Sequence, residues 1–129
     1  MILFCDRNMG KKIPAALRSL GLSVLCHDDH FAPDTLDDEL LERVGKEGWL
    51  IVTRDMRFLK IPSQARSLID HNVGCFVLYR AASLPRWDAV RIIARNWDHI
   101  VASARSERRP FLHKLYLRHA VRQVDLPSR

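Results

Sequence analysis

The stretch Trp49-Leu50-Ile51-Val52-Thr53-Arg54-Asp55 decides the fold, because a compact apolar and β-branched run ends in charged residues. Such a run predicts a central strand over residues 49–53. The residues that follow, 54–62, contain several basic side chains and predict a loop after the strand. Fold and candidate chemistry therefore meet at the end of this strand.

Apolar runs and helical patterns alternate on both sides of this stretch. Three further apolar runs predict strands at residues 1–5, 22–26 and 73–79. Between them, spacing and breaker residues predict helices over residues 11–20, from Thr35 to Gly48, from Ser63 onward and from Ser83 to Arg105. Thr35 is the expected N-cap of the second helix, with Asp38 completing a variant capping box. This alternation predicts an α/β fold with a mostly parallel central sheet, right-handed crossovers and helices on both faces.

The last third of the chain predicts one long helix and an uncertain tail. Within residues 83–105, apolar side chains recur at spacings of three and four, as a single buried stripe requires: Trp87, Val90, Ala94, Trp97, Val101 and Ala104. We expect the three tryptophans, Trp49 among them, to pack in the core. After Pro110, a weak alternation around Arg118-His119-Ala120 predicts a C-terminal strand pair at 111–117 and 121–126, with a helix as the alternative.

Length and composition predict a single domain spanning residues 1–129, with a core at 1–104 and a basic C-terminal extension at 105–129. Hydrophobic residues make up 47% of the chain, which is too many for intrinsic disorder. The net charge is +6, and acids gather between residues 28 and 47 whereas arginines fill the tail. An acidic site beside a basic surface suits an enzyme that acts on nucleic acid, although an ordinary solvated surface remains an alternative.

The opening apolar segment, residues 1–5, is too short for a signal peptide or a membrane span, so we expect a cytoplasmic protein without membrane contact. The three cysteines, Cys5, Cys26 and Cys75, are odd in number and lack C-x-x-C spacing. Each lies in an apolar run. We expect them to be buried free thiols.

Aspartates occur where parallel strands end. Asp6 follows the first predicted strand, Asp55 follows the third, and Asp37 opens the helix that leads into the third. Because ligands of open parallel sheets bind beyond the carboxyl ends of the strands, we expect these carboxylates to converge. Converging carboxylates repel one another and suit Mg²⁺ or Mn²⁺. Taken singly, Asp37 has an alternative role at the positive end of a helix, and Asp6 and Asp55 as loop formers.

Several short motifs occur in a familiar order: Phe4-Cys5-Asp6-Arg7-Asn8-Met9, His27-Asp28-Asp29-His30-Phe31, Asp37-Asp38-Glu39 and Val52-Thr53-Arg54-Asp55. In this order and spacing the sequence resembles a PIN-like domain, close to the short branch of VapC-like toxins. Asp6, Asn8 and Met9 match the opening motif of that family. The resemblance covers most of residues 1–80, with an extension through Trp87 and Trp97.

The resemblance implies a metal-dependent endoribonuclease that hydrolyses RNA phosphodiester bonds, as the toxin of a toxin–antitoxin pair. It implies three sets of site residues, namely the catalytic Mg²⁺ or Mn²⁺ ligands Asp6, Asp37 and Asp55, the supporting residues Asn8, Asp38 and Thr53, and the phosphate-binding residues Arg54, Arg57 and Lys60. The implied partners are RNA, an antitoxin protein and a second copy of the chain, with the helix over residues 83–105 as a candidate interface.

One departure from the family leaves alternatives open. Many relatives carry a further acid where this sequence has Arg57, just before Phe58, and this chain also lacks the acid that relatives often place on an additional helix. A catalytically degenerate module that binds nucleic acid or an antitoxin is therefore a second hypothesis. A receiver-like signalling domain is a third, but it needs an adjacent acidic pair where this chain has Asp6-Arg7. Asp29 and His30 are either catalytic or a loop anchor.

Overall fold

The computed structural model describes residues 1–118 and 121–128, so Arg129 and the central residues of the expected C-terminal turn, 119–120, lie outside the described residues. The described residues form six strands: β1 (Leu3–Cys5), β2 (Val24–Cys26), β3 (Leu50–Thr53), β4 (Gly74–Leu78), β5 (Phe111–Leu115) and β6 (Arg122–Val124). They form six α-helices: α1 (Lys12–Ser19), α2 (Asp37–Glu47), α3 (Arg57–Lys60), α4 (Pro62–Asp70), α5 (Arg86–Arg95) and α6 (Trp97–Ser106). Two single-turn 3-10 helices, η1 (Arg7–Met9) and η2 (His27–Asp29), follow β1 and β2.

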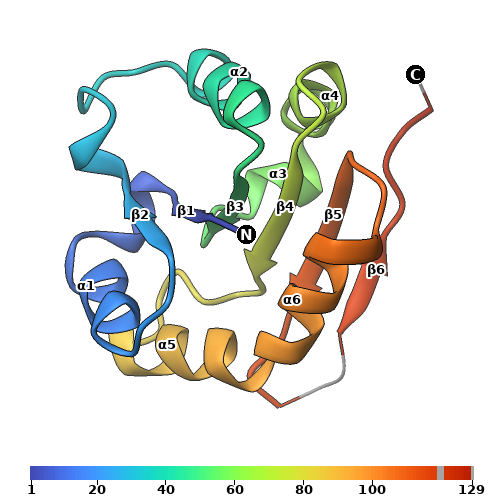
Figure 1. Cartoon of the computed structure of the whole chain (residues 1–129). Helices are drawn as coiled ribbons and strands as arrows, with labels where there is room; N and C mark the ends of the chain where they lie inside the picture. Colours follow the sequence, from blue (N-terminus) through green and yellow to red (C-terminus); the bar gives the residue numbers. More distant parts are fainter. Residues whose placement is uncertain (119–120, 129) are drawn as a thin grey trace.

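The six strands form one sheet in the order β2-β1-β3-β4-β5-β6. All neighbours are parallel except β6, which runs antiparallel to β5 (Figure 1). The chain moves from β1 to β2 on one side and then returns to place β3 on the other side of β1. The predicted α/β class and mostly parallel sheet are confirmed. The reversal between β1 and β3 is the point at which such sheets bind ligands.

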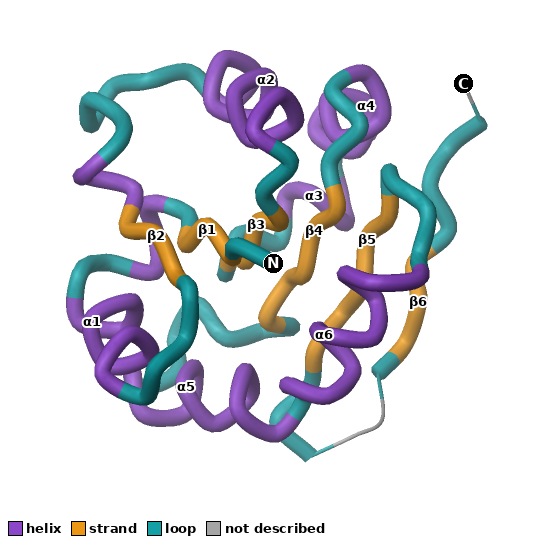
Figure 2. Tube along the Cα trace, viewed as in Figure 1, coloured by secondary structure: helices purple, strands orange, loops and turns teal. Residues whose placement is uncertain are grey.

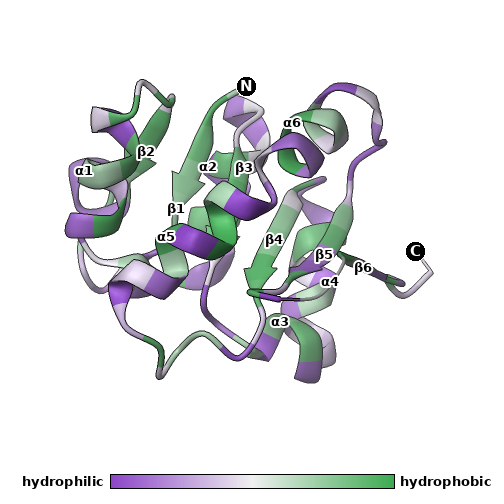
Figure 3. Cartoon of the chain, turned by 90° about the horizontal axis from the view of Figure 1, so that it is seen from below, coloured by the Kyte–Doolittle hydropathy of each residue, from purple (hydrophilic) through white to green (hydrophobic). Residues whose placement is uncertain are grey.

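Helices cover both faces of the sheet, as the continuous apolar strands require (Figures 1 and 2). Along β1 and β3, Phe4 and Ile51 face the cluster formed by α2, α3 and α4, whereas Leu3 and Val52 face the cluster formed by α1, α5 and α6. The view from below in Figure 3 shows apolar strands beneath helices whose outer positions are polar. Burial of apolar side chains on two faces therefore holds the strand ends in place.

One crossover has the opposite hand to the others. The connections β2-to-β3 and β3-to-β4 pass over the face of α2, α3 and α4, whereas β4-to-β5 moves in the same direction across the sheet but passes over the other face. The prediction that every crossover shares the right-handed form was therefore wrong. Since α1 alone cannot cover the second face of a sheet this wide, α5 and α6 supply the missing layer, and their two-helix link is long enough to reach it.

The predicted long helix is two helices, divided at Asn96. The Asn96 amide donates to the carbonyl oxygens of Ile92, at 2.8 Å, and Tyr116, at 3.2 Å, and so competes with a continuous helix. The buried positions of these helices also differ from the predicted apolar stripe. The fully buried apolar positions of the two helices are Ala89, Ile92, Ile93 and Ile100.

Trp87 corrects another prediction, because 69% of this residue is exposed to solvent. Trp49 is buried and Trp97 is half-buried, as expected. The predicted C-terminal strand pair is present as β5 and β6. The segment after residue 104 is no appendage to the core, because β5 lies between β4 and β6 and buries Phe111 and Leu115.

Local signals at two helix starts differ from the prediction. Thr35 donates its hydroxyl to the carbonyl of Ala32, at 2.8 Å, and Leu36 is the N-cap of α2, without a side-chain cap. The expected loop after β3 contains the single-turn helix α3. The three cysteines are buried free thiols, as predicted, and burial raises the pKa of Cys5 to about 12. Among the described residues, no helix combines the length and apolar character needed to cross a bilayer.

Gly45 fixes the position of α2, the helix that carries Asp37. A Cβ atom at this position would overlap the backbone carbonyl of His71, which follows the last turn of α4. Because the obstacle is backbone rather than a flexible side chain, α2 approaches α4 this closely only with glycine at position 45.

We predict that Gly45→Ala lowers the free energy of unfolding by about 1–3 kcal/mol through overpacking. Elsewhere in a helix the same change would stabilise by about 1 kcal/mol. Urea denaturation measures the difference. Lys46→Ala, at the next and exposed position of the same helix, is the control and should change stability by less than about 0.5 kcal/mol. A Gly45→Ala protein as stable as wild type would contradict the close approach of the helices.

A row of titratable side chains links α6 to β5 on the face covered by α1, α5 and α6. His113 is buried, and its Nε2 lies 2.8 Å from a carboxylate oxygen of Glu107. Its Nδ1 lies 2.8 Å from Nε2 of His99. With both rings neutral, His113 donates to Glu107 and accepts from His99. Desolvation, together with the neighbouring His113, lowers the pKa of His99 below its usual 6.5, against a smaller opposing effect of Glu107.

We predict that the protein loses stability as the pH falls below about 6.5, in part through His99. Its pKa is lower in the folded state than in the unfolded state, so the unfolded chain binds more protons and acid favours unfolding. Urea denaturation of wild type and His99→Gln at several pH values measures this. At pH 8 the ring is neutral in both states, so the comparison there measures the altered contacts of residue 99 without any contribution from protonation of the ring. An unchanged pH slope in His99→Gln would refute the prediction.

Candidate active site

The carboxyl ends of β1 and β3 place Asp6 beside Thr53. The two strands are parallel neighbours with Cys5 opposite Val52, and the N–H of Asp6 donates to the carbonyl of Val52 at 3.0 Å. Asp6 then caps the 3-10 helix η1 by accepting the N–H of Arg7 at 2.8 Å. The sheet register and this cap together fix the direction of the first carboxylate.

Asp6 is only 9% exposed and is held by a polar network. The Thr53 hydroxyl donates to Oδ2 of Asp6 at 2.8 Å and accepts the N–H of Asp55 at 3.0 Å. The Asn8 amide donates to the same hydroxyl at 3.0 Å and accepts the N–H of Arg54 at 3.0 Å. Asn8 and Thr53 therefore lie beside Asp6 and are hydrogen-bonded to each other and to the segment that carries Asp55.

The charge state of Asp6 reflects its surroundings. Burial raises its pKa, and the negative charges of Asp37 and Asp55 raise it further, whereas hydrogen bonds from Thr53 and the Arg7 N–H act in the opposite direction. Repulsion of this kind disappears when a cation binds between the carboxylates. The electrostatics of the site thus favour a positively charged ligand.

The three predicted aspartates line one cavity of about 160 Å³, together with Arg7, Asn8 and Arg57. Asp6 comes from the end of β1, Asp55 from the end of β3 and Asp37 from the first turn of α2. Their meeting depends on the adjacency of β1 and β3 and on the packing of α2 over that sheet face.

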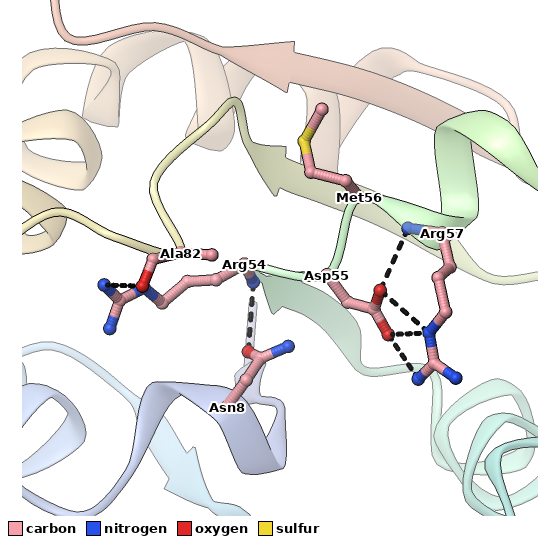
Figure 4. Close-up of a pocket in the computed structure, with 6 residues that line it drawn as sticks. All are labelled: Asn8, Arg54, Asp55, Met56, Arg57 and Ala82. Atoms are coloured by element: carbon pink, nitrogen blue, oxygen red, sulfur yellow. Dashed lines mark hydrogen bonds and ion pairs between the residues drawn. The ribbon is translucent and has the colours of Figure 1, made fainter.

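Arg57 lies against two of these carboxylates, and Figure 4 shows its contacts with Asp55. Its Nη2 is 2.6 Å from Oδ2 of Asp55, its Nε is 2.9 Å from the same oxygen, and its backbone N–H donates to Oδ1 at 2.9 Å. Nη2 also lies 3.5 Å from Oδ2 of Asp37. Desolvation raises the pKa of Asp55, but the hydrogen bonds and charge of Arg57 outweigh it and leave that pKa lowered.

A wider groove of about 400 Å³ opens beside the acidic cavity and shares Asn8, Asp55 and Arg57 with it. Figure 4 shows this groove with Met56 and Ala82 among its walls. Neither residue is predictable from the sequence as part of the site, because neither side chain carries a chemical signal and Ala82 lies in a loop distant in sequence. The acids therefore form one end of a longer depression.

Three predicted site residues lie elsewhere or are engaged. Asp38 accepts a hydrogen bond from the Ser67 hydroxyl at 2.6 Å and lies 2.9 Å from the His71 ring. The hydrogen bond from Ser67, and to a smaller extent the contact with His71, lower the pKa of Asp38. Arg54 donates to the carbonyls of the loop that precedes α5, at 2.9 Å to Ala81 and 2.6 Å to Leu84. Lys60 lines a separate cavity beside the C-terminal segment. The structure thus does not bring Asp38 or Lys60 to the acidic cavity, and it gives Arg54 a role in holding a loop.

Asp29 and His30 also lie away from the acids. Asp29 pairs with Arg18 at 3.3 Å, and the His30 ring packs edge-on against Trp49 with centroids 5.4 Å apart. The neighbouring Phe31 packs against Phe4 at 5.5 Å. These contacts match the loop anchor rather than a catalytic pair.

The donor set fits a hard divalent cation in its chemistry, because three carboxylates share one cavity and a guanidinium is already drawn to two of them. The present arrangement is not a preformed cage. Among residues 1–118 and 121–128, no three or more His, Cys, Asp or Glu side chains are grouped closely enough to hold a metal ion.

Comparison with known protein families identifies one matching family. The sequence profile of a family described as "PIN like domain" matches residues 1–80, which include β1 to β4 and all three cavity aspartates. No curated protein and no solved structure matched the chain. Such domains are generally nucleases. The match covers more than half of the chain, and it favours the nuclease-like interpretation of the strand-end acids over the receiver-like one. The chain belongs to the PIN-like domain family.

Proposed function

We propose that this protein is an endoribonuclease that hydrolyses RNA phosphodiester bonds with Mg²⁺ or Mn²⁺. The observation that carries the proposal is the convergence of Asp6, Asp37 and Asp55 from three separate segments on one cavity beside a groove. Family membership supplies the reaction class, and a net charge of +6 is compatible with a polyanionic substrate.

Each residue of the site has its own role in this proposal. Asp6, Asp37 and Asp55 would hold the divalent cation, which when bound lowers the pKa of water and neutralises charge on the phosphate under attack. Thr53 and Asn8 keep the Asp6 carboxylate oriented through direct and relayed hydrogen bonds. The groove lined by Met56 and Ala82 receives the nucleotide next to the scissile bond. Arg54 keeps one wall of the groove in place by binding the loop carbonyls.

We predict that Asp6→Asn and Asp55→Asn each lower the rate of RNA cleavage in Mg²⁺ or Mn²⁺ by about a hundredfold or more, because each removes a charge that holds the cation. A fluorescent RNA cleavage assay measures the rate. Asp29→Asn is the matched control, since it removes an equal charge outside the cavity and should retain activity. EDTA should abolish cleavage by the wild type. A folded Asp6→Asn protein that cleaves at the wild-type rate would overturn the proposed site.

We predict a smaller and selective effect at Thr53. Thr53→Val keeps the shape of the side chain but removes the hydroxyl that bonds Asp6 and the N–H of Asp55. Of the hydrogen bonds that are lost, the one to the Asp6 carboxylate alone should lower the free energy of unfolding by about 1.5–3 kcal/mol. Cleavage should fall at least about tenfold through misorientation of the carboxylate. Thr53→Ser should restore most of both quantities, and equal activity of all three proteins would exclude a positioning role.

The motif resemblance to short VapC-like toxins supports a further part of this proposal, a toxin role with a protein antitoxin. Expression of wild type should then arrest bacterial growth, and expression of Asp6→Asn should not. Equal growth of the two cultures would count against the toxin role alone and would leave the nuclease proposal to the cleavage assay.

One observation favours a second candidate, a non-catalytic module that binds nucleic acid. Arg57 forms ion pairs with carboxylates that would otherwise be free to bind a metal ion. Binding to RNA that weakens steeply with salt, without cleavage in Mg²⁺ or Mn²⁺, would support this candidate and exclude the nuclease.

A further inference from the structure

We propose that Arg57 is an exchangeable internal cation: it neutralises Asp55 and Asp37 in the free protein and transfers to a substrate phosphate when a divalent cation takes its place between the carboxylates. This inference deepens the proposed nuclease function and rests on it. It assigns Arg57 a position in the substrate-binding step rather than treating it as a lost acid.

The guanidinium of Arg57 contacts the same carboxylates that would hold a divalent cation. The guanidinium makes a two-point contact with Asp55, through Nη2 at 2.6 Å and Nε at 2.9 Å to the same oxygen. Nη2 also reaches Asp37 at 3.5 Å, so a single group spans two of the three acids.

Arg57 differs from the other arginines that line the two cavities. Arg54 is fixed by several backbone carbonyls, and Arg7 donates to the carbonyl of Pro33 while its guanidinium also lies 3.8 Å from Asp37. The side-chain hydrogen bonds of Arg57 are with Asp55 and Asp37. If another cation satisfied these carboxylates, no other side-chain hydrogen bond within residues 1–118 and 121–128 would hold the guanidinium in place.

The position of Arg57 allows the exchange. Its side chain is 53% exposed whereas that of Asp55 is 15% exposed, so the guanidinium is the partner that solvent and substrate can reach. Arg57 lines both the acidic cavity and the wider groove. A phosphate in the groove offers two oxygens to the same planar fork that now binds a carboxylate. Leaving Asp55 therefore costs Arg57 no ion pair when substrate is present.

The first test is Mn²⁺ binding by the full chain, followed by the EPR signal of free Mn²⁺. Arg57→Gln should bind Mn²⁺ on the order of three- to tenfold more tightly than wild type, since a competing ion pair of this exposure is removed. Lys60→Gln removes one positive charge from the same helix without touching the acids and should match wild type. Unchanged or weaker binding by Arg57→Gln, or an equal gain in Lys60→Gln, would overturn the inference.

The second test adds a slowly cleaved phosphorothioate RNA oligonucleotide. It should tighten Mn²⁺ binding more in wild type than in Arg57→Gln, because in wild type part of the coupling between the cation and the phosphate passes through the Arg57 side chain. An uncharged methylphosphonate oligonucleotide should leave Mn²⁺ affinity unchanged. Equal tightening in wild type and Arg57→Gln would refute the transfer to phosphate.

Failure of the inference and failure of the proposed function give different results. RNA cleavage together with unchanged Mn²⁺ affinity in Arg57→Gln would remove the exchange and keep the nuclease. Tighter Mn²⁺ binding without any cleavage would keep the internal cation and remove the nuclease. Circular dichroism establishes that each variant is folded, and Arg57→Lys, which retains the charge without the fork, should fall between wild type and Arg57→Gln.

Discussion

Three carboxylates face one small cavity, and the repulsion among them has to be offset by positive charge. The fold creates this situation, because the reversal of strand order between β1 and β3 brings Asp6 and Asp55 to the same edge and α2 adds Asp37. Burial of Asp6 makes the requirement stronger, since solvent screens its charge poorly. Two groups of the protein stabilise this negative charge. The Thr53 hydroxyl donates a hydrogen bond to Asp6, and the guanidinium of Arg57 forms an ion pair with Asp55.

The strand-end acids were predictable because their placement depends on local sequence. An apolar run of strand length followed by an aspartate puts that carboxylate at the carboxyl edge, whatever the details of packing. The choice between Asp37 and Asp38 was not predictable in this way. Successive helix residues point about 100° apart, and the contact of Gly45 with α4 determines which of the two faces the cavity and which one meets Ser67 and His71.

The helices of the last third show where pattern alone fails. Two sets of apolar residues in the segment 86–106 fit a helical stripe, and the larger side chains suggested the wrong one, with Trp87 inside. Burial instead selects the set containing Ile92 and Ile93, because these pack on the face that α1 leaves uncovered. The break at Asn96 depends on the carbonyl of Tyr116, which lies 20 residues later in the chain. Contacts of this kind leave no trace in a local window.

At Arg57 the structure adds information that the sequence alone does not give. In the sequence Arg57 is a basic residue where the resemblance to PIN-like domains implies an acid, which left a catalytically degenerate module as an alternative. The structure shows in addition how Arg57 is held. Asp55 lies two residues before Arg57, the first residue of α3, so the backbone N–H and the side chain of Arg57 both bind the carboxylate of Asp55. A fourth acid would add repulsion to the cavity, whereas an arginine relieves it without an external ligand. Arg57 therefore supplies, from within the chain, positive charge beside two of the three aspartates that face the cavity.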